Sequence, residues 1–112
     1  MESVWRVGLH APFSPSDIWF ILAKIPEGNV VTYGQLANMA GAPGYARVVG
    51  NILKQLPSGS GLPWHRVINS KGQISFPEAS AKYQQQQSLL ESEGVTLLNG
   101  KVNLKLYQWN GE

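Results

Sequence analysis

The chain has 112 residues and a formal net charge of +2; 43% of the residues are hydrophobic, 14% are charged and none is cysteine. This length predicts one domain, and the lack of cysteine excludes disulfides, thiolate nucleophiles and cysteine-ligated zinc. No apolar run reaches the roughly 18 residues of a membrane span and no signal peptide is recognisable, which predicts a cytoplasmic protein without a membrane partner.

The first part of the chain predicts an N-terminal arm followed by a helix. Residues 1–13 show no clear period, whereas residues 14–112 are predicted to form the domain. Ser14 is suited to the N-cap and Pro15 to the first helical position, which predicts a helix that runs to about residue 24. The core-facing residues expected on this helix are Ile18, Ile21, Leu22 and Ile25.

Two further helices are predicted on either side of a glycine-containing turn. Thr32 and Gln35 match a capping box, which predicts a helix ending near residue 40. The next helix is predicted over residues 46–56, where a proline follows. This succession is the helix-turn-helix arrangement, in which the second helix presents side chains to a DNA groove.

The distribution of charge agrees with a nucleic-acid partner. Residues 28–77 contain no carboxylate but carry the cations Arg47, Lys54, Arg66 and Lys71. An ordinary solvated surface mixes both signs, so an acid-free region indicates a polyanion. Because four cations give a small electrostatic footprint, tight non-specific coating of DNA is not expected.

The start of the helix predicted over residues 46–56 combines small side chains with a cation. Ala46 and Gly50 would let the helix come close to a sugar-phosphate backbone, and Arg47 could reach past that backbone. The alternative is a helix–helix contact through Gly50, with Arg47 merely solvated.

The second half of the chain predicts short strands, turns and one more helix. A buried strand is expected at residues 67–68, closed by a turn over residues 69–72. The helix is expected over residues 78–93, where a glycine follows. Residues 95–104 predict a hairpin with a type I′ turn at Asn99-Gly100.

The segment before the predicted strand contains a tryptophan next to a histidine, Trp64-His65. Pro63 fixes the backbone direction in which the chain reaches Trp64. One interpretation is that Trp64 belongs to the core and that His65 is a hydrogen-bonded structural histidine. Because His10 lies far away in the sequence, we expect no metal site, and we expect no cofactor.

Three segments resemble motifs of one family, and they occur in the family's order. They are residues 30–37 (VVTYGQLA), residues 46–50 (ARVVG) and residues 63–69 (PWHRVIN). Over about residues 14–98 the chain resembles the C-terminal domain of the O6-alkylguanine-DNA alkyltransferases. In those enzymes the position of Trp64 is the cysteine that accepts the alkyl group. The match with tryptophan is therefore to the alkyltransferase-like proteins.

The resemblance implies a small α/β, winged-helix-like DNA-binding domain with a helix-turn-helix that acts as a monomer at the nucleoid. It implies that the protein binds O6-alkylguanine in double-stranded DNA through the minor groove, flips the base and flags it for nucleotide excision repair proteins. By the same resemblance Arg47 is the finger that fills the vacated space, Tyr33 helps to rotate the 3′ phosphate and Trp64 lines the pocket. The expected lesion- and DNA-binding residues are Tyr33, Ala46, Arg47, Gly50, Trp64 and Arg66.

The chemistry of the residues agrees that the protein is not an enzyme. Transfer from an O-alkyl base needs a soft, strong nucleophile such as a thiolate, and an indole is too weak. His65 resembles the family's activating histidine, and Glu93 resembles the glutamate that orients it. Without a thiol to deprotonate, this pair is expected to serve as a hydrogen-bonded structural brace of the pocket.

Two positions depart from the pattern of the repair enzymes. Leu56 stands where those enzymes have an asparagine at the end of the recognition helix, so that contact is lost. Pro77 stands where they have a tyrosine over the pocket, so a different preference for alkyl size is expected.

Two alternative functions come from other classes. A sequence-specific transcription regulator would read the major groove with side chains such as Asn51 and Lys54, usually from a dimer. A lesion-processing hydrolase would work through His65 and Glu93 and would release free base or alcohol.

Overall fold

The computed structural model describes residues 11–57 and 59–111, so most of the arm predicted over residues 1–13 lies outside the described residues. None of the helices in this described part is long and apolar enough to cross a membrane. The chain divides into two compact units, each made of two separate stretches. The helical unit comprises residues 11–24 and 33–64, and the mixed unit comprises residues 25–32 and 65–111.

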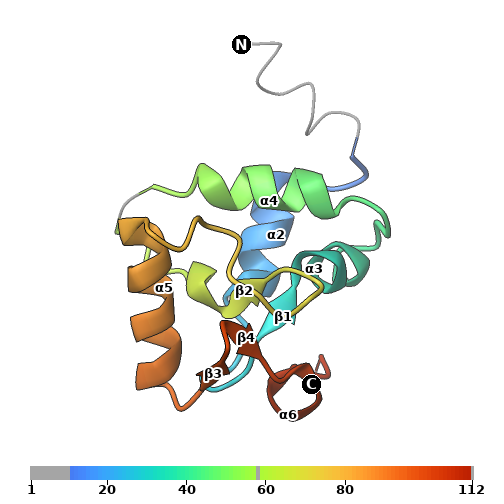
Figure 1. The fold of residues 1–112 in the computed structure, drawn as a ribbon. Coiled ribbons are helices and arrows are strands. Elements are labelled where there is room, and N and C mark those ends of the chain that lie inside the picture. The colour runs from blue at the N-terminus through green and yellow to red at the C-terminus, as the bar shows by residue number, and fades with distance from the viewer. Residues whose placement is uncertain (1–10, 58, 112) are drawn as a thin grey trace. The chain divides into compact units, whose positions relative to one another are not determined.

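The helical unit contains three helices (Figure 1): α2 (Pro15–Leu22), α3 (Tyr33–Met39) and α4 (Ala46–Lys54). All three pack against one another. The predicted start of α2 is confirmed, because Ser14 is its N-cap and its backbone N–H donates to the Asp17 carboxylate over 2.9 Å. Each of the three helices ends slightly earlier than the sequence predicted, and α3 and α4 form the predicted helix-turn-helix.

The core of the helical unit is apolar and draws on all three helices. Ile21 was expected in this core but is only half-buried. Phe13 precedes α2 and is buried, with its ring edge-on to Tyr45 at a centroid distance of 6.0 Å. The buried residues of the unit are Phe13, Ile18, Leu22, Leu36, Ala37, Ala42, Val49 and Ile52.

The mixed unit contains two pairs of short strands. β1 (Val31–Thr32) pairs in parallel with β2 (Val67–Ile68), and β2 is the strand that the sequence predicted. β3 (Leu97–Leu98) pairs antiparallel with β4 (Lys101–Val102). The predicted type I′ turn is confirmed, because Asn99-Gly100 has φ values of 54° and 75°.

The turn over residues 69–72 packs directly on β4. Asn69 closes this turn by accepting the Gly72 N–H, and the Gly72 carbonyl accepts the Val102 N–H over 2.8 Å. Gly72 has φ +81°, and a Cβ there would lie 2.6 Å from the Val102 carbonyl oxygen. Only glycine therefore fits at this position.

Two helices complete the mixed unit. α5 (Ala81–Ser92) starts later than predicted, because the Ser80 hydroxyl caps it by accepting the Tyr83 N–H over 3.2 Å. α6 (Leu104–Tyr107) was not predicted. The Asn103 side chain caps α6 and thereby ends the hairpin strand earlier than the sequence indicated.

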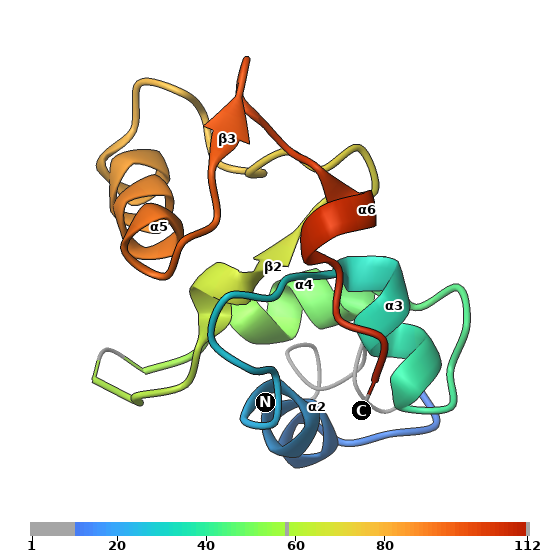
Figure 2. The same cartoon turned by 90° about the horizontal axis from the view of Figure 1, so that it is seen from below.

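The C-terminal segment, which follows α6 (Figure 2), forms a parallel bridge between Gln108 and Val30, next to β1. The Val30 N–H donates to the Tyr107 carbonyl and the Trp109 N–H donates to the Val30 carbonyl, each over 2.9 Å. These bonds hold residues 107–109 against the buried cluster of the unit. The cluster consists of Val30, Ile68, Ile74, Tyr83, Leu90, Val95, Leu97 and Val102.

Candidate nucleic-acid interface

One side of α4 carries the small residues and the cation that the sequence singled out. Ala46 and Gly50 are half-buried and one turn apart, and Arg47 between them is exposed. Among the described residues, Arg47 makes no hydrogen bond or ion pair. Within the described part of the chain, its guanidinium is therefore not engaged.

Tyr33, the first residue of α3, lies over Gly50. A Cβ built on Gly50 would be 3.9 Å from Tyr33 Cδ1 and Cε1, which is ordinary van der Waals contact. The two helices do meet at Gly50, as the alternative interpretation of this glycine expected, but the packing leaves room for a methyl group. Because glycine inside a helix costs about 0.5–1 kcal/mol relative to alanine, internal packing alone does not explain it.

Trp64 ends the helical unit and is half-buried. The backbone N–H of Trp64 donates to the Leu62 carbonyl over 2.8 Å, so Pro63 occupies the centre of a three-residue turn. Trp64 also begins a single 3₁₀ turn, η1 (Trp64–Arg66), which the sequence did not predict. The chain passes from the helical unit into the mixed unit between Trp64 and His65.

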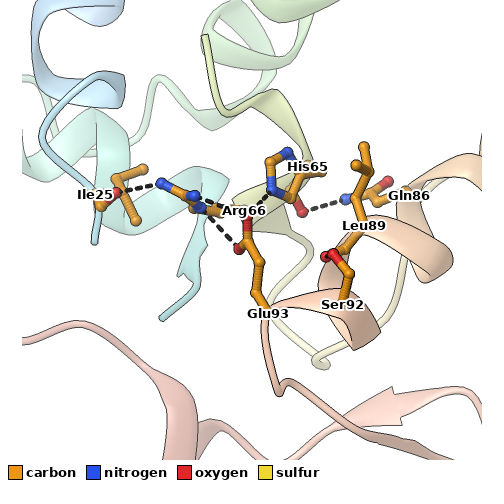
Figure 3. A network of polar contacts seen from close by, with 7 residues as sticks. All are labelled: Ile25, His65, Arg66, Gln86, Leu89, Ser92 and Glu93. Atoms are coloured by element: carbon orange, nitrogen blue, oxygen red, sulfur yellow. Dashed lines mark hydrogen bonds and ion pairs between the residues drawn. The ribbon is translucent and has the colours of Figure 1, made fainter. Parts of the chain in front are cut away.

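In the mixed unit, two neighbouring residues of η1 meet the end of α5 (Figure 3). The imidazole Nε2 of His65 lies 2.8 Å from Glu93 Oε2. Arg66 holds the same carboxylate with two bonds, from Nε to Oε1 at 2.9 Å and from Nη2 to Oε2 at 2.7 Å. Its Nη1 donates to the Ile25 carbonyl over 2.7 Å. We call His65, Arg66 and Glu93 the brace.

The brace keeps Glu93 ionised. Burial alone would raise the pKa of Glu93, but hydrogen bonds from Arg66 and His65, together with their charges, outweigh burial and lower the pKa from 4.5 to about 2. Because an ionised carboxylate only accepts, Nε2 of His65 carries the proton between them. A general base needs a pKa near the working pH, so this carboxylate is poorly suited to act as a general base itself.

The sequence placed Arg66 among the DNA-binding residues, and the structure engages its guanidinium within the mixed unit. The sequence also gave no role to Gln86, whose side chain is buried on α5 and bonds the backbone next to Arg66. The available signal was a glutamine at core-facing spacing between Tyr83 and Leu90.

The structure thus brings the predicted residues together in two groups. Tyr33 lies against Gly50 on the helix that carries Ala46 and Arg47, and His65 and Glu93 bond each other in the brace. Within the described part of the chain, no cluster of three or more histidine and carboxylate side chains could hold a metal ion.

Comparisons with known proteins show the family to which the chain belongs. Residues 14–95 match the family model of the 6-O-methylguanine DNA methyltransferase, DNA binding domain. A DNA base-flipping protein of Escherichia coli is 48% identical over 86% of this chain and 74% of its own length. Alkyltransferase-like protein 1 of Schizosaccharomyces pombe is 43% identical over 84% of this chain and 92% of its own.

A solved structure is also similar. It is S. pombe Atl1 in complex with damaged DNA containing O6-carboxymethylguanine, with a TM-score of 0.79 and 42% identity over 86% of this chain and 94% of that chain. The chain therefore belongs to the family of the 6-O-methylguanine DNA methyltransferase DNA-binding domain, and the predicted α/β fold class is confirmed. Within this family it is an alkyltransferase-like protein, as its identity to the relatives named above shows, and none of its 112 residues is cysteine.

Proposed function

We propose that this protein binds double-stranded DNA containing O6-alkylguanine, flips the damaged base out of the stack and holds it without removing the alkyl group. One observation carries the proposal: the helix-turn-helix face with the exposed Arg47 is followed in the chain by Trp64. By the family resemblance, Trp64 stands where the repair enzymes have their acceptor cysteine. The names of the relatives support it, since one is a DNA base-flipping protein and Atl1 is bound to DNA containing O6-carboxymethylguanine.

The energetics favour recognition of a damaged base over an intact one. Extrusion of a base costs a few kcal/mol, and the cost is smaller where pairing is already weakened, as it is for an O6-alkylated guanine. Contact of a base with an aromatic side chain returns about 1–3 kcal/mol. Because the two terms are similar in size, the weakened pairing decides which bases are held. In this proposal Trp64 supplies the aromatic contact.

The face of α4 is proposed to enter the minor groove. Ala46 and Gly50 allow close approach, Arg47 fills the space that the base leaves, and Tyr33 contacts the 3′ phosphate. A helix in the minor groove opens and bends the duplex. We assign Arg66 to the brace, where with His65 and Glu93 it holds the segment that follows Trp64.

The bound lesion is proposed to be handed to nucleotide excision repair. Since an indole cannot accept the alkyl group, the lesion survives binding and has to be processed by other proteins. A bent duplex with an extruded base, held by a monomer, is a persistent mark for them. Incision of an O6-alkylguanine duplex by a reconstituted excision system should rise when the protein is added. Unchanged incision would contradict the handoff and leave lesion binding intact.

The binding proposal is tested with one duplex sequence that contains guanine, O6-methylguanine or a larger O6-alkylguanine, at one salt concentration. We expect lower dissociation constants for the alkylated duplexes, and no added mass on the protein after incubation. Equal dissociation constants, or a methyl group moved onto the protein, would falsify it. Preference for one undamaged sequence over all lesions would favour the transcription regulator.

A further inference from the structure

Gln86 is a fully buried polar residue on α5. It is 1% exposed and lies on the same side of the helix as Tyr83 and Leu90. Its amide Nε2 donates to the His65 carbonyl and to the Val67 carbonyl, each over 3.0 Å (Figure 3 shows the bond to His65). Its Oε1 has no hydrogen-bond partner among the described residues.

In the Gln86 side chain the donor Nε2 makes two hydrogen bonds and the acceptor Oε1 makes none, and this difference indicates why position 86 is a glutamine. A buried acceptor without a partner is unfavourable, and methionine would fill a similar volume without that loss. Because the acceptor end only destabilises, the benefit of Gln86 comes from its donor end. The two carbonyls that it binds are therefore the reason for the residue.

Those two carbonyls lie where η1 passes directly into β2. The last carbonyls of a helical turn have no partner within the turn and need a donor from elsewhere. Gln86 donates to one of them, the His65 carbonyl, and also to the Val67 carbonyl at the start of β2, on either side of Arg66. Glu93 follows two turns later on α5 and binds the side chains of the same segment. The carbonyls of His65 and Val67 are thus held by Gln86, and the side chains of His65 and Arg66 by Glu93, the C-cap of α5.

We propose that Gln86 is a positioning residue for Trp64. Trp64 directly precedes the segment that Gln86 holds, and its own N–H is fixed on the other side by the turn around Pro63. With the backbone fixed on both sides, the point from which the indole projects is set, and only its χ1 and χ2 rotations remain. This inference rests on the proposed function, since it concerns the residue that is proposed to line the lesion pocket.

The test replaces Gln86 and observes the indole directly. The indole N–H signal of Trp64 in the nitrogen–proton NMR spectrum is assigned by its loss in Trp64→Phe. In Gln86→Met this signal should shift and broaden, while the indole signals of Trp19 and Trp109 keep their chemical shifts. The ratio of dissociation constants for undamaged and O6-methylguanine duplexes should fall about fivefold to tenfold, as for the loss of one to two hydrogen bonds. If Gln86→Met does not fold, Gln86→Asn replaces it in the test. Its shorter side chain cannot reach both carbonyls, so the same changes in the Trp64 signal and in the lesion preference are expected.

Two control variants separate positioning from general stability. Gln85→Met changes the exposed neighbour on α5, and Val95→Ala weakens the core of the mixed unit while Gln86 and its two hydrogen bonds to residues 65 and 67 are kept. Both should keep the Trp64 signal and the lesion preference. The inference is overturned if both Gln86 variants keep them too, or if Val95→Ala loses them equally. If the unaltered protein shows no lesion preference, the proposed function fails and the NMR comparison alone decides the role of Gln86.

Discussion

Each of the two units contains an arginine of interest, and the two arginines have opposite environments. In the helical unit Arg47 is exposed on α4, with no ion pair among the described residues. In the mixed unit Arg66 is turned inward, where it binds Glu93 with two bonds and the Ile25 carbonyl with a third. Because an exposed arginine adds little to stability, whereas removal of one partner from a largely buried ion pair is strongly destabilising, substitutions in the two units should have separable effects.

The largest effect is expected in the brace. Glu93→Gln removes the charge that pairs Arg66 and should lower the free energy of unfolding by about 3 kcal/mol at neutral pH. Since the pKa of Glu93 is lowered from 4.5 to about 2 in the folded state, its contribution is complete above pH 4.5 and is lost as the pH falls toward 2. Urea denaturation across this window measures it.

The exposed Glu91 provides the control for Glu93, because it lies on the same helix outside the brace. Glu91→Gln should change the free energy of unfolding by less than about 0.5 kcal/mol and keep the acid dependence of the unaltered protein. Equal behaviour of the two glutamine variants would show that the brace does not stabilise the mixed unit.

The next effect is expected for Arg47, and it should appear in binding alone. Arg47→Ala removes the side chain proposed to fill the space of the flipped base, so the dissociation constant for an O6-methylguanine duplex should rise on the order of 10–100-fold. The melting temperature should stay unchanged. Lys54→Ala, another exposed cation on α4, should have a much smaller effect. A lower melting temperature for Arg47→Ala would break the contrast between the units.

A smaller and more selective effect is expected for Trp64. Trp64→Ala removes one aromatic contact, so affinity for the lesion should fall about tenfold while affinity for undamaged DNA changes little. Titration of both duplexes with each variant measures the difference. Trp19→Ala, at a partly exposed tryptophan on α2, is the control. Equal losses on both duplexes would remove Trp64 from the lesion pocket.

The smallest effect is expected for Gly50, where stability and binding should move in opposite directions. Gly50→Ala fits the space beside Tyr33, so the free energy of unfolding should rise by about 0.5–1 kcal/mol. The added methyl group would stand between α4 and the sugar-phosphate backbone and should weaken DNA binding. Denaturation and gel-shift measurements on one preparation compare the two. A more stable variant with unchanged DNA binding would mean that no backbone approaches Gly50.

Features with a local cause were predictable from the sequence. Ser14 and Pro15 begin α2, and Asn99-Gly100 forms the predicted turn, because each depends on residues a few positions away. The pairing of His65 with Glu93 came from the family resemblance. The motifs also indicated which residues share α4, since helical spacing alone puts Arg47 beside Gly50.

Features with a distant cause were not predictable. The partners of Arg66 and Gln86 lie far along the chain, and no local pattern indicates that α5 will meet η1. No local pattern predicted the 3₁₀ turn at Trp64 either. The early end of the hairpin strand has a local cause that the sequence analysis missed, because the Asn103 side chain caps α6 by accepting the Lys105 N–H.

The parallel pairing of β1 with β2 has a consequence for the order of folding during synthesis. Val31 pairs with Val67, so β1 leaves the ribosome before α3 and α4 and waits for its partner until both of those helices have been made. Contacts this distant in sequence form late, since the intervening loop has to close first. In nascent chains stalled before residue 67 is made, a protease should therefore still cut the segment that contains β1, while α3 and α4 are already protected.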